Sequence, residues 1–301
     1  MANMKAVVLH HPGPPGSLKL ETRPIPTPNK GQVLIQIKAF GLNRSELFTR
    51  LGYSPNVKLP RILGIEAVGL VHEAPGGEFE KGDVVATCMG GLGREVDGGR
   101  STRGPSGRSC RGNVLGALPE MLQTSWGALN RNLGIREGET LLIRGGTTSV
   151  GLVAAAIAKS QGLVVLATTR RIDREGLLRA SGVDHIVVDE GSVVGKVKGI
   201  FPAGVDRVLE LVGSTLTDSV GVVGGNNADS ADDALPDGAT YAFYGGEQED
   251  FHALPLEKLL GQVRDGSLPV QIGRNFRLEE IVEAHRVMEE NTAGGKIVVL
   301  T

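Results

Sequence analysis

The residues with the clearest chemical potential form the segment GGTTSVG, Gly145 to Gly151, which follows the apolar run TLLIR. An apolar stretch with helical spacing comes next, and the chain returns to a second strand-like run, VVLATT, at Val164. Small residues at a strand-to-helix junction allow a sharp turn and a close approach of helix and strand. The free N–H groups and partial positive charge of the helix N-terminus favour a pyrophosphate. The segment therefore predicts a dinucleotide-binding turn.

Every residue of this turn is a candidate for contact with the cofactor: Gly145, Gly146, Thr147, Thr148, Ser149, Val150 and Gly151. The three hydroxyls offer additional donors. Thr148 stands where the usual fingerprint has its second glycine, and a Cβ at that position can crowd the phosphates. A turn that serves only packing and binds nothing is the alternative interpretation.

The end of the second strand-like run indicates which nucleotide is bound. In NAD-specific sheets, a carboxylate about 20 residues after the glycine turn accepts hydrogen bonds from the ribose 2′-OH. Here the run ends at Thr169 and is followed by Arg170 and Arg171, with no carboxylate before Asp173. Guanidinium groups bind a 2′-phosphate bidentately, so we predict NADPH (NADP) as the cofactor. The alternative is a solvated turn in which Asp173 reaches back to offset the arginines.

Composition predicts a soluble protein of the reducing cytoplasm with a small-molecule partner. The 32 Lys and Arg residues nearly balance the 34 Asp and Glu residues, so no field favours nucleic acid or an anionic membrane. The chain shows no signal-peptide core and no apolar run of membrane length. Cys88 and Cys110 are too few for a disulfide framework, and no CxxC motif begins a zinc site.

A length of 301 residues favours two domains. The first third alternates short β-rich runs with Pro and Gly, as an antiparallel, barrel-like domain does. From about Gly116, strand and helix patterns alternate, which predicts an α/β, doubly wound parallel sheet. We place the β-rich domain at residues 1–117 and 270–301 and the nucleotide domain at residues 118–269. The arginine-rich stretch 90–113 has almost no apolar residue, so we expect a loop or disorder there.

Several separated stretches together resemble the medium-chain dehydrogenase/reductase superfamily, in its zinc-independent quinone oxidoreductase (enoyl reductase-like) branch. They are MKAVVLHHPGPPGSLKLETRPIP, GQVLIQIKAFGLNRSELFTRLGYSP, LPRILGIEAVGLV, FEKGDVV, the Gly145 turn, DRVLELVGS and GGKIVVL. The resemblance implies a GroES-like β-rich domain beside a Rossmann domain. It also implies hydride transfer from a reduced nicotinamide to a quinone, enone or enoyl thioester. Dimerisation through the sheet edge is common in this family, so the resemblance allows a homodimer.

The departures from the zinc enzymes of this superfamily remove the metal site. Those enzymes place a zinc-binding Cys and His where this chain has Asn43 and Ile65, although Glu66 remains. Without a thiolate or imidazole, a tetrahedral zinc site lacks its ligands, so we predict no metal. Glu66 is either a relic of the zinc enzymes or the partner of an arginine such as Arg44.

The resemblance also assigns the remaining site residues. Asn43 and Tyr53 are expected to line the nicotinamide and substrate cleft, with the Tyr53 hydroxyl able to donate a hydrogen bond or a proton to a carbonyl. Thr124 aligns with a contact to the carboxamide, and Val212, Gly213 and Tyr244 align with strand ends beside the cofactor. The alternatives are a turn aromatic for Tyr53 and a buried helix hydroxyl for Thr124.

Two segments depart from the family pattern: residues 90–113 and residues 221–238, where the family has a further parallel strand. They keep open an alternative function, a catalytically impaired NADPH-binding structural or regulatory protein of the same fold. The physiological substrate is not encoded in any motif, because specificity in this branch lies in variable loops.

Overall fold

A computed structural model describes residues 2–88, 101–103, 112–224, 244–245, 251 and 253–301. The chain forms two compact units. The first comprises Met1–Gln123, Gly245–Leu260 and Gln271–Thr301, and the second comprises Thr124–Tyr244 and Gly261–Val270. The sequence-based boundaries differ from this division mainly at residues 245–260, which the sequence pattern assigns to the nucleotide domain and which cluster with the β-rich unit.

The first unit is GroES-like and consists mainly of antiparallel strands. One sheet has the order β2-β1-β4 and the other has the order β12-β13-β3-β5-β6-β7. The strands are β1 (Asn3–Leu9), β2 (Leu18–Pro24), β3 (Leu34–Gly41), β4 (Arg61–Ile62), β5 (Glu66–Glu73), β6 (Val84–Cys88), β7 (Ser101–Arg103), β12 (Ile272–Arg277) and β13 (Lys296–Leu300). The closing strand β13 pairs antiparallel with β3, which returns the C-terminal residues to the first unit.

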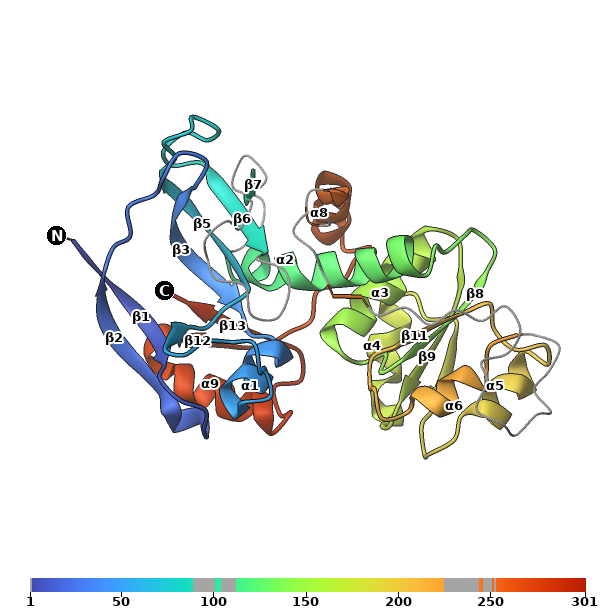
Figure 1. The fold of residues 1–301 in the computed structure, drawn as a ribbon. Helices are drawn as coiled ribbons and strands as arrows, with labels where there is room; N and C mark the ends of the chain where they lie inside the picture. The colour runs from blue at the N-terminus through green and yellow to red at the C-terminus, as the bar shows by residue number, and fades with distance from the viewer. Residues whose placement is uncertain (1, 89–100, 104–111, 225–243, 246–250, 252) are drawn as a thin grey trace. The chain divides into compact units, whose positions relative to one another are not determined.

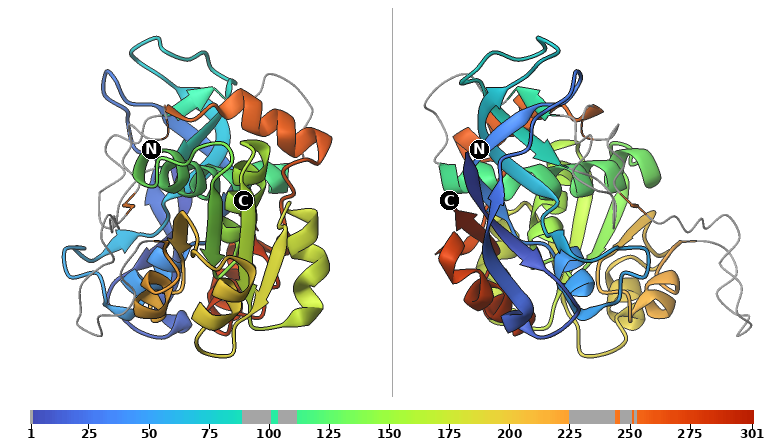
Figure 2. Two further views of the ribbon diagram at one scale, coloured as in Figure 1. Left: turned by 90° about the vertical axis from the view of Figure 1, so that its right-hand side faces the viewer. Right: turned by 60° about the vertical axis from the view of Figure 1, so that its left-hand side comes forward.

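Helix α9 (Ile281–Glu289) closes the apolar core of this unit. Its apolar residues recur at helical spacing, so one face carries Ile281, Ala284 and Val287 into a cluster with Val7 and Leu9 of β1. Figures 1 and 2 both show α9 lying against β1 and β2. Helix α1 (Arg44–Leu51) follows β3 and contacts α9.

The expectation of a loop or disorder over residues 90–113 is wrong at two places. Ser101–Arg103 form β7, which pairs antiparallel with β6. Backbone pairing requires no apolar face, so a polar sequence can still form a short edge strand. The segment also contains the start of helix α2 (Gly112–Gly127), which begins before Gly116, where the helical pattern of the sequence becomes evident. The rest of the segment lies outside the described residues.

The second unit is a Rossmann-like domain. Its parallel sheet has the order β10-β9-β8-β11. Its elements are β8 (Thr140–Arg144), α3 (Ser149–Ser160), β9 (Val164–Thr169), α4 (Glu175–Ala180), β10 (His185–Val188), α5 (Val194–Ile200), β11 (Arg207–Glu210) and α6 (Leu216–Val220). Helix α8 (Leu256–Asp265) begins in the first unit and ends in the second.

Side chains of successive strand residues point to opposite faces of the sheet. Leu142 and Leu166 pack against Val193 and Val197 at the start of and within α5. Ala167, next to Leu166, instead lies against Gly146 on the side of α3 and α4 (Figure 1). Helices thus cover both faces of the sheet, as in a doubly wound fold. Within the part of the chain that is described, no helix has the length and apolarity needed to cross a membrane.

The buried His285 of α9 predicts an acid-sensitive first unit. The residue is 2 % exposed, and burial together with the nearby Arg50 charge lowers its pKa from 6.5 to about 3. His285 therefore binds a proton below pH 6.5 in the unfolded chain, but only below about pH 3 in the folded chain. We therefore expect the free energy of unfolding to decrease as the pH is lowered from 6.5 to about 3. This group contributes a slope of up to about 1.4 kcal/mol per pH unit.

Urea unfolding between pH 4 and 7 tests this expectation. His285→Gln should flatten the pH dependence, whereas His11→Gln, at an exposed position, should leave it as in the wild type. Equal slopes for wild type and His285→Gln would show that another group causes the acid sensitivity.

Candidate functional site

The turn between β8 and α3 is closed by backbone contacts that leave no room for larger side chains. Gly145 has a φ of +83°, in the left-handed region that favours glycine. A Cβ on Gly151 would lie 2.6 Å from the Gly145 carbonyl oxygen, and one on Gly146 would lie 2.6 Å from the Cβ of Ala167. The glycines therefore bring β8, β9 and the start of α3 into direct contact, as a dinucleotide-binding turn requires.

Thr148 is the N-cap of α3, and its hydroxyl closes the turn internally. Its Oγ1 accepts a hydrogen bond from the Gly151 amide at 3.0 Å and donates one to the Gly145 carbonyl at 2.9 Å. The residue that replaces the second fingerprint glycine thus stabilises the helix start. Its hydroxyl is engaged within the turn, so of the three hydroxyls we expect Thr147 and Ser149 to be the ones open to a ligand.

The first amides of α3 face out of the helix end. Ser149 and Val150 occupy the first two helical positions, where a backbone N–H has no partner within the helix. The carbonyl of Val150 is held by the hydroxyl of Ser125 at 3.0 Å, and Ser125 is fully buried. The sequence analysis did not single out Ser125. Its neighbour Thr124, which the family resemblance selects, is half-buried.

Two arginines follow the end of β9, and of these Arg171 forms an ion pair with Asp173. Arg171 donates to Asp173 from Nε at 3.1 Å and from Nη2 at 2.5 Å. Arg170 is exposed, and we find no ion pair for it among the described residues. The Thr169 hydroxyl donates to the Arg171 carbonyl and accepts from the Arg171 amide, so Thr169 shapes this turn.

The end of β11 lies directly beside the glycine turn. A Cβ on Gly145 would be 3.2 Å from the Val212 side chain, and the Leu211 amide donates to the Arg144 carbonyl at 3.1 Å. Val212 is 48 % exposed although it is aliphatic. These contacts bring Val212 and Gly213 together with Gly145 at the carboxyl ends of β8 and β11. The strand order reverses at this point, and ligands of doubly wound folds bind there.

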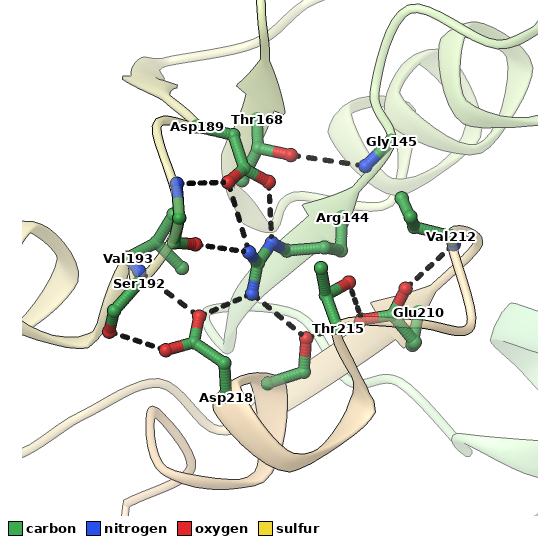
Figure 3. A network of polar contacts seen from close by, with 12 residues as sticks. Arg144, Gly145, Thr168, Asp189, Ser192, Val193, Glu210, Val212, Thr215 and Asp218 are labelled. Carbon is green, nitrogen blue, oxygen red and sulfur yellow. Dashed lines mark hydrogen bonds and ion pairs between the residues drawn. The ribbon is translucent and has the colours of Figure 1, made fainter.

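Glu210 fixes the Val212–Gly213 turn and was missed by the sequence analysis. Its Oε1 accepts hydrogen bonds from the Val212 amide at 2.6 Å and the Gly213 amide at 3.0 Å. Figure 3 shows this carboxylate beneath the turn. A carboxylate that ends a strand just before a glycine turn is the local signal that could have identified it.

Tyr244 lies against the last turn of α2. A Cβ on Gly127 would fall 2.1 Å from the Tyr244 hydroxyl oxygen, so the ring occupies the space that Gly127 leaves. Both residues belong to the second unit. The other residues of the YAFYGG motif, Tyr241–Phe243 and Gly246, lie outside the described residues.

Asn43 in the first unit is held at both ends of its side-chain amide. Its Nδ2 donates to Glu66 Oε1 at 2.9 Å, and its Oδ1 accepts from Lys296 Nζ at 2.5 Å. The Lys296 ammonium also lies 2.8 Å from Glu66 and 3.4 Å from Glu120. The suggested pairing of Glu66 with Arg44 is therefore wrong. Arg44 is exposed, while Glu66 is buried and takes its cation from the distant strand β13.

The buried carboxylates around Lys296 keep it charged. Burial opposes the ammonium charge, but the nearby Glu66 and Glu120 outweigh this and raise the pKa of Lys296. Burial also raises the pKa of Glu46 to about 8, against the hydrogen bond from the Asn43 amide. The cluster thus holds a permanent cation next to a carboxyl group that is mostly protonated at neutral pH.

Tyr53 lies beyond the opposite end of α1 from Asn43. Asn43 is the N-cap of the helix, whereas Tyr53 follows its C-cap, Gly52. The Tyr53 side chain is 72 % exposed, and its amide donates to the Phe48 carbonyl. The two predicted catalytic residues are therefore separated by the eight residues of α1, and only Tyr53 presents a free-standing polar group.

Among the described residues, no group of three or more His, Cys, Asp and Glu side chains could hold a metal ion. The three glutamates that approach one another near Asn43 surround the Lys296 ammonium instead. Cys88 is buried, and Cys110 lies outside the described residues.

Two family models match this chain. Residues 29–138 match the alcohol dehydrogenase GroES-like domain, and residues 181–299 match a zinc-binding dehydrogenase domain. A quinone oxidoreductase from Pongo abelii is 27 % identical over 334 residues, covering 99 % of this chain and 98 % of that protein. An acryloyl-coenzyme A reductase from Sulfurisphaera tokodaii is 31 % identical over 220 residues, covering 62 % of this chain and 64 % of that protein.

Solved structures show the same fold. AibC superposes with a TM-score of 0.84 at 25 % identity, covering 99 % of this chain and 96 % of that one. The quinone oxidoreductase of Escherichia coli complexed with NADPH superposes with a TM-score of 0.83 at 20 % identity, covering 99 % and 100 %.

The raised pKa of Glu46 predicts a loss of stability in alkali. The folded chain keeps the Glu46 proton up to about pH 8, whereas the unfolded chain releases it near pH 4.5. The unfolded state is therefore favoured as pH rises between these values, with a slope of up to about 1.4 kcal/mol per pH unit, and the loss is complete above pH 8. Glu46→Gln should remove this slope in chemical denaturation from pH 5 to 9.

Glu73→Gln is the matched control, because Glu73 is exposed on β5. It should retain the wild-type slope. A Glu46→Gln variant with the wild-type slope would mean that Glu46 is ionised in the folded protein.

Proposed function

Because the chain belongs to the medium-chain dehydrogenase/reductase superfamily, in its quinone oxidoreductase branch, we propose that it is a zinc-independent oxidoreductase that transfers hydride from NADPH to a quinone, enone or enoyl thioester. The observation that carries the choice of cofactor is the end of β9, where Arg170 is free and no carboxylate precedes Asp173. The names of the two relatives, a quinone oxidoreductase and an acryloyl-coenzyme A reductase, support this range of acceptors.

The second unit supplies the residues that would hold the cofactor. The α3 amides of Ser149 and Val150, with the hydroxyls of Thr147 and Ser149, would bind the pyrophosphate. Val212 offers an exposed aliphatic surface, and among the described residues beyond its chain neighbours no atom lies within 4 Å of where a Cβ on Gly213 would stand. We assign Thr124 and Tyr244 to the same cofactor site. When bound, the nicotinamide supplies the hydride from its C4, and the chain supplies position and exclusion of water.

The first unit would supply the polar groups for the acceptor. The Tyr53 hydroxyl is exposed and free to donate a hydrogen bond or a proton to a carbonyl oxygen. Asn43 would act through the one amide proton that Glu66 does not take, in an orientation fixed by Lys296. In this proposal the acceptor is a small molecule. The family resemblance allows a homodimer, and the composition favours the cytoplasm.

Arg170 is expected to carry more of the NADPH preference than Arg171. Asp173 neutralises Arg171, whereas Arg170 can turn its whole fork to a 2′-phosphate. Arg170→Ala should lower NADPH affinity about tenfold or more while NADH affinity stays within a few-fold. Asp173→Asn should raise NADPH affinity, because it releases Arg171.

Nucleotide titration by nicotinamide fluorescence measures both effects. Arg136→Ala, an exposed arginine that precedes β8 at the amino edge of the same sheet, is the matched control and should bind both nucleotides as the wild type does. Equal loss of NADPH and NADH affinity in Arg170→Ala, or a wild-type preference for NADH, would contradict the assignment.

The role of the Tyr53 hydroxyl is tested by Tyr53→Phe with 1,2-quinones, 1,4-quinones and enones as acceptors. We expect turnover to fall about 10²-fold or more, as for loss of a proton donor, with NADPH affinity unchanged. Unaltered turnover would make Tyr53 a turn aromatic. NADPH binding without turnover by the wild type across this panel would instead favour the catalytically impaired binding protein.

Zinc independence is tested by elemental analysis of protein purified without chelators. We expect far less than one zinc per chain, because Asn43 and Ile65 cannot replace a thiolate and an imidazole as ligands. One equivalent of zinc that survives dialysis would overturn this part of the proposal.

A further inference from the structure

The second unit contains a fully buried cation that the proposed reaction does not use. Arg144 is the last residue of β8, directly before the glycine turn, and its side chain is 0 % exposed. It lies on the same face of β8 as Leu142, two residues earlier, which is part of the apolar core beneath α5. The guanidinium therefore ends this core at the carboxyl edge of the sheet.

Arg144 binds two loops that follow two other strands. Asp189, directly after β10, accepts from Nε at 2.9 Å and from Nη2 at 3.1 Å, and the Gly191 carbonyl accepts from Nη2 at 3.0 Å. Asp218 of α6, which follows β11, accepts from Nη1 at 2.5 Å. Figure 3 shows the guanidinium between these groups.

Each loop is then tied to the other. Asp218 accepts hydrogen bonds from the Ser192 hydroxyl and, at 3.0 Å, from the Val193 amide of the β10 loop. Ser219, 3.4 Å from Arg144 Nη1, donates to Glu210 Oε2 at 2.5 Å. Glu210 in turn holds the amides of Val212 and Gly213 through its other oxygen.

The charge balance makes the cation indispensable to this edge. One guanidinium contacts two carboxylates, those of Asp189 and Asp218, and a third, that of Glu210, is linked to it through Ser219. Burial opposes ionisation of Asp218, but hydrogen bonds from Ser192, Val193 and Arg144 outweigh it and lower its pKa. Without Arg144, these negative charges would stand uncompensated at the edge where a dinucleotide pyrophosphate binds.

We propose that Arg144 is a positioning residue for the cofactor: it sets the Val212–Gly213 turn against the glycine turn through Ser219 and Glu210, and it binds the β10 loop to the same frame. The proposal rests on the proposed function only for the identity of the ligand. The contacts require a planar guanidinium, because Nε and Nη2 donate to Asp189 while Nη1 donates to Asp218. A lysine ammonium keeps the charge but cannot make these directed contacts together.

Arg144→Lys tests the proposal, with Arg207→Lys as the matched control. Arg207 begins β11 and pairs with Glu139 at 3.0 Å, so the control changes an arginine–carboxylate pair on the same sheet at its opposite edge. Amide hydrogen exchange of the ligand-free proteins, dinucleotide titration, and kcat and KM are measured at a temperature where thermal unfolding shows both variants folded.

We expect Arg144→Lys to speed exchange of the Val212 and Gly213 amides about tenfold or more while β9 amides exchange as in the wild type. NADPH and NADH affinity should both fall about tenfold or more, with kcat at saturating nucleotide within a few-fold. Arg207→Lys should leave both the amide exchange of Val212 and Gly213 and the nucleotide affinities as in the wild type. Equal effects of the two variants, or wild-type exchange in Arg144→Lys, would overturn the proposal.

Two further outcomes are decided in advance. Should Arg144→Lys not fold, Asp189→Asn weakens the same grip without removing the guanidinium, and the same comparison of Val212 and Gly213 exchange supports or overturns the proposal. Should the wild type bind neither nucleotide, the proposed function fails, and the exchange of the ligand-free protein still decides the role of Arg144.

Discussion

The contact between the backbone of β8 and the first turn of α3 sets the geometry of the whole nucleotide-binding edge. Gly151 approaches the Gly145 carbonyl so closely that a single methyl group would not fit. This approach aims the free α3 amides at the carboxyl edge of the sheet. It also places the Val212 turn within van der Waals reach of Gly145, because β11 neighbours β8. Enlarging Gly151 would therefore displace the helix start and both turns at once.

Local patterns in the sequence were sufficient to predict the elements that build this edge. The strands β8 to β11 and the glycine turn follow from apolar runs and small residues whose effects are confined to a few neighbours. The same patterns did not predict the role of Thr148, which was noted only as a Cβ that can crowd the phosphates. Its side chain turns back onto Gly145 and Gly151, and such a cap depends on backbone geometry that the residue type alone does not give.

The contacts that orient the polar groups could not be predicted, since they join residues far apart in the chain. Lys296 reaches Asn43 across 253 positions, so no spacing rule connects them, and the sequence offered exposed Arg44 as the nearer partner of Glu66. Arg144 ends the apolar run TLLIR, and nothing in that run indicates what its guanidinium contacts. Only the return of the β10 and β11 loops to the edge buries it.

In each unit a buried cation lies among more than one carboxylate, Lys296 in the first and Arg144 in the second, but the two cations impose different constraints. A buried ion pair gains little net stability, because desolvation of the charges offsets much of their attraction. What it supplies is geometry, and the geometry depends on the cation. The compact ammonium of Lys296 accepts partners from several directions and tolerates the neutral Asn43 among them. The flat guanidinium of Arg144 donates only along its N–H directions, so it holds Asp189 and Asp218 in fixed directions. The directional Arg144 therefore lies where the loops after β10 and β11 must be held at a fixed distance from the glycine turn. The point charge of Lys296 lies where only the side-chain amide of Asn43 must be oriented.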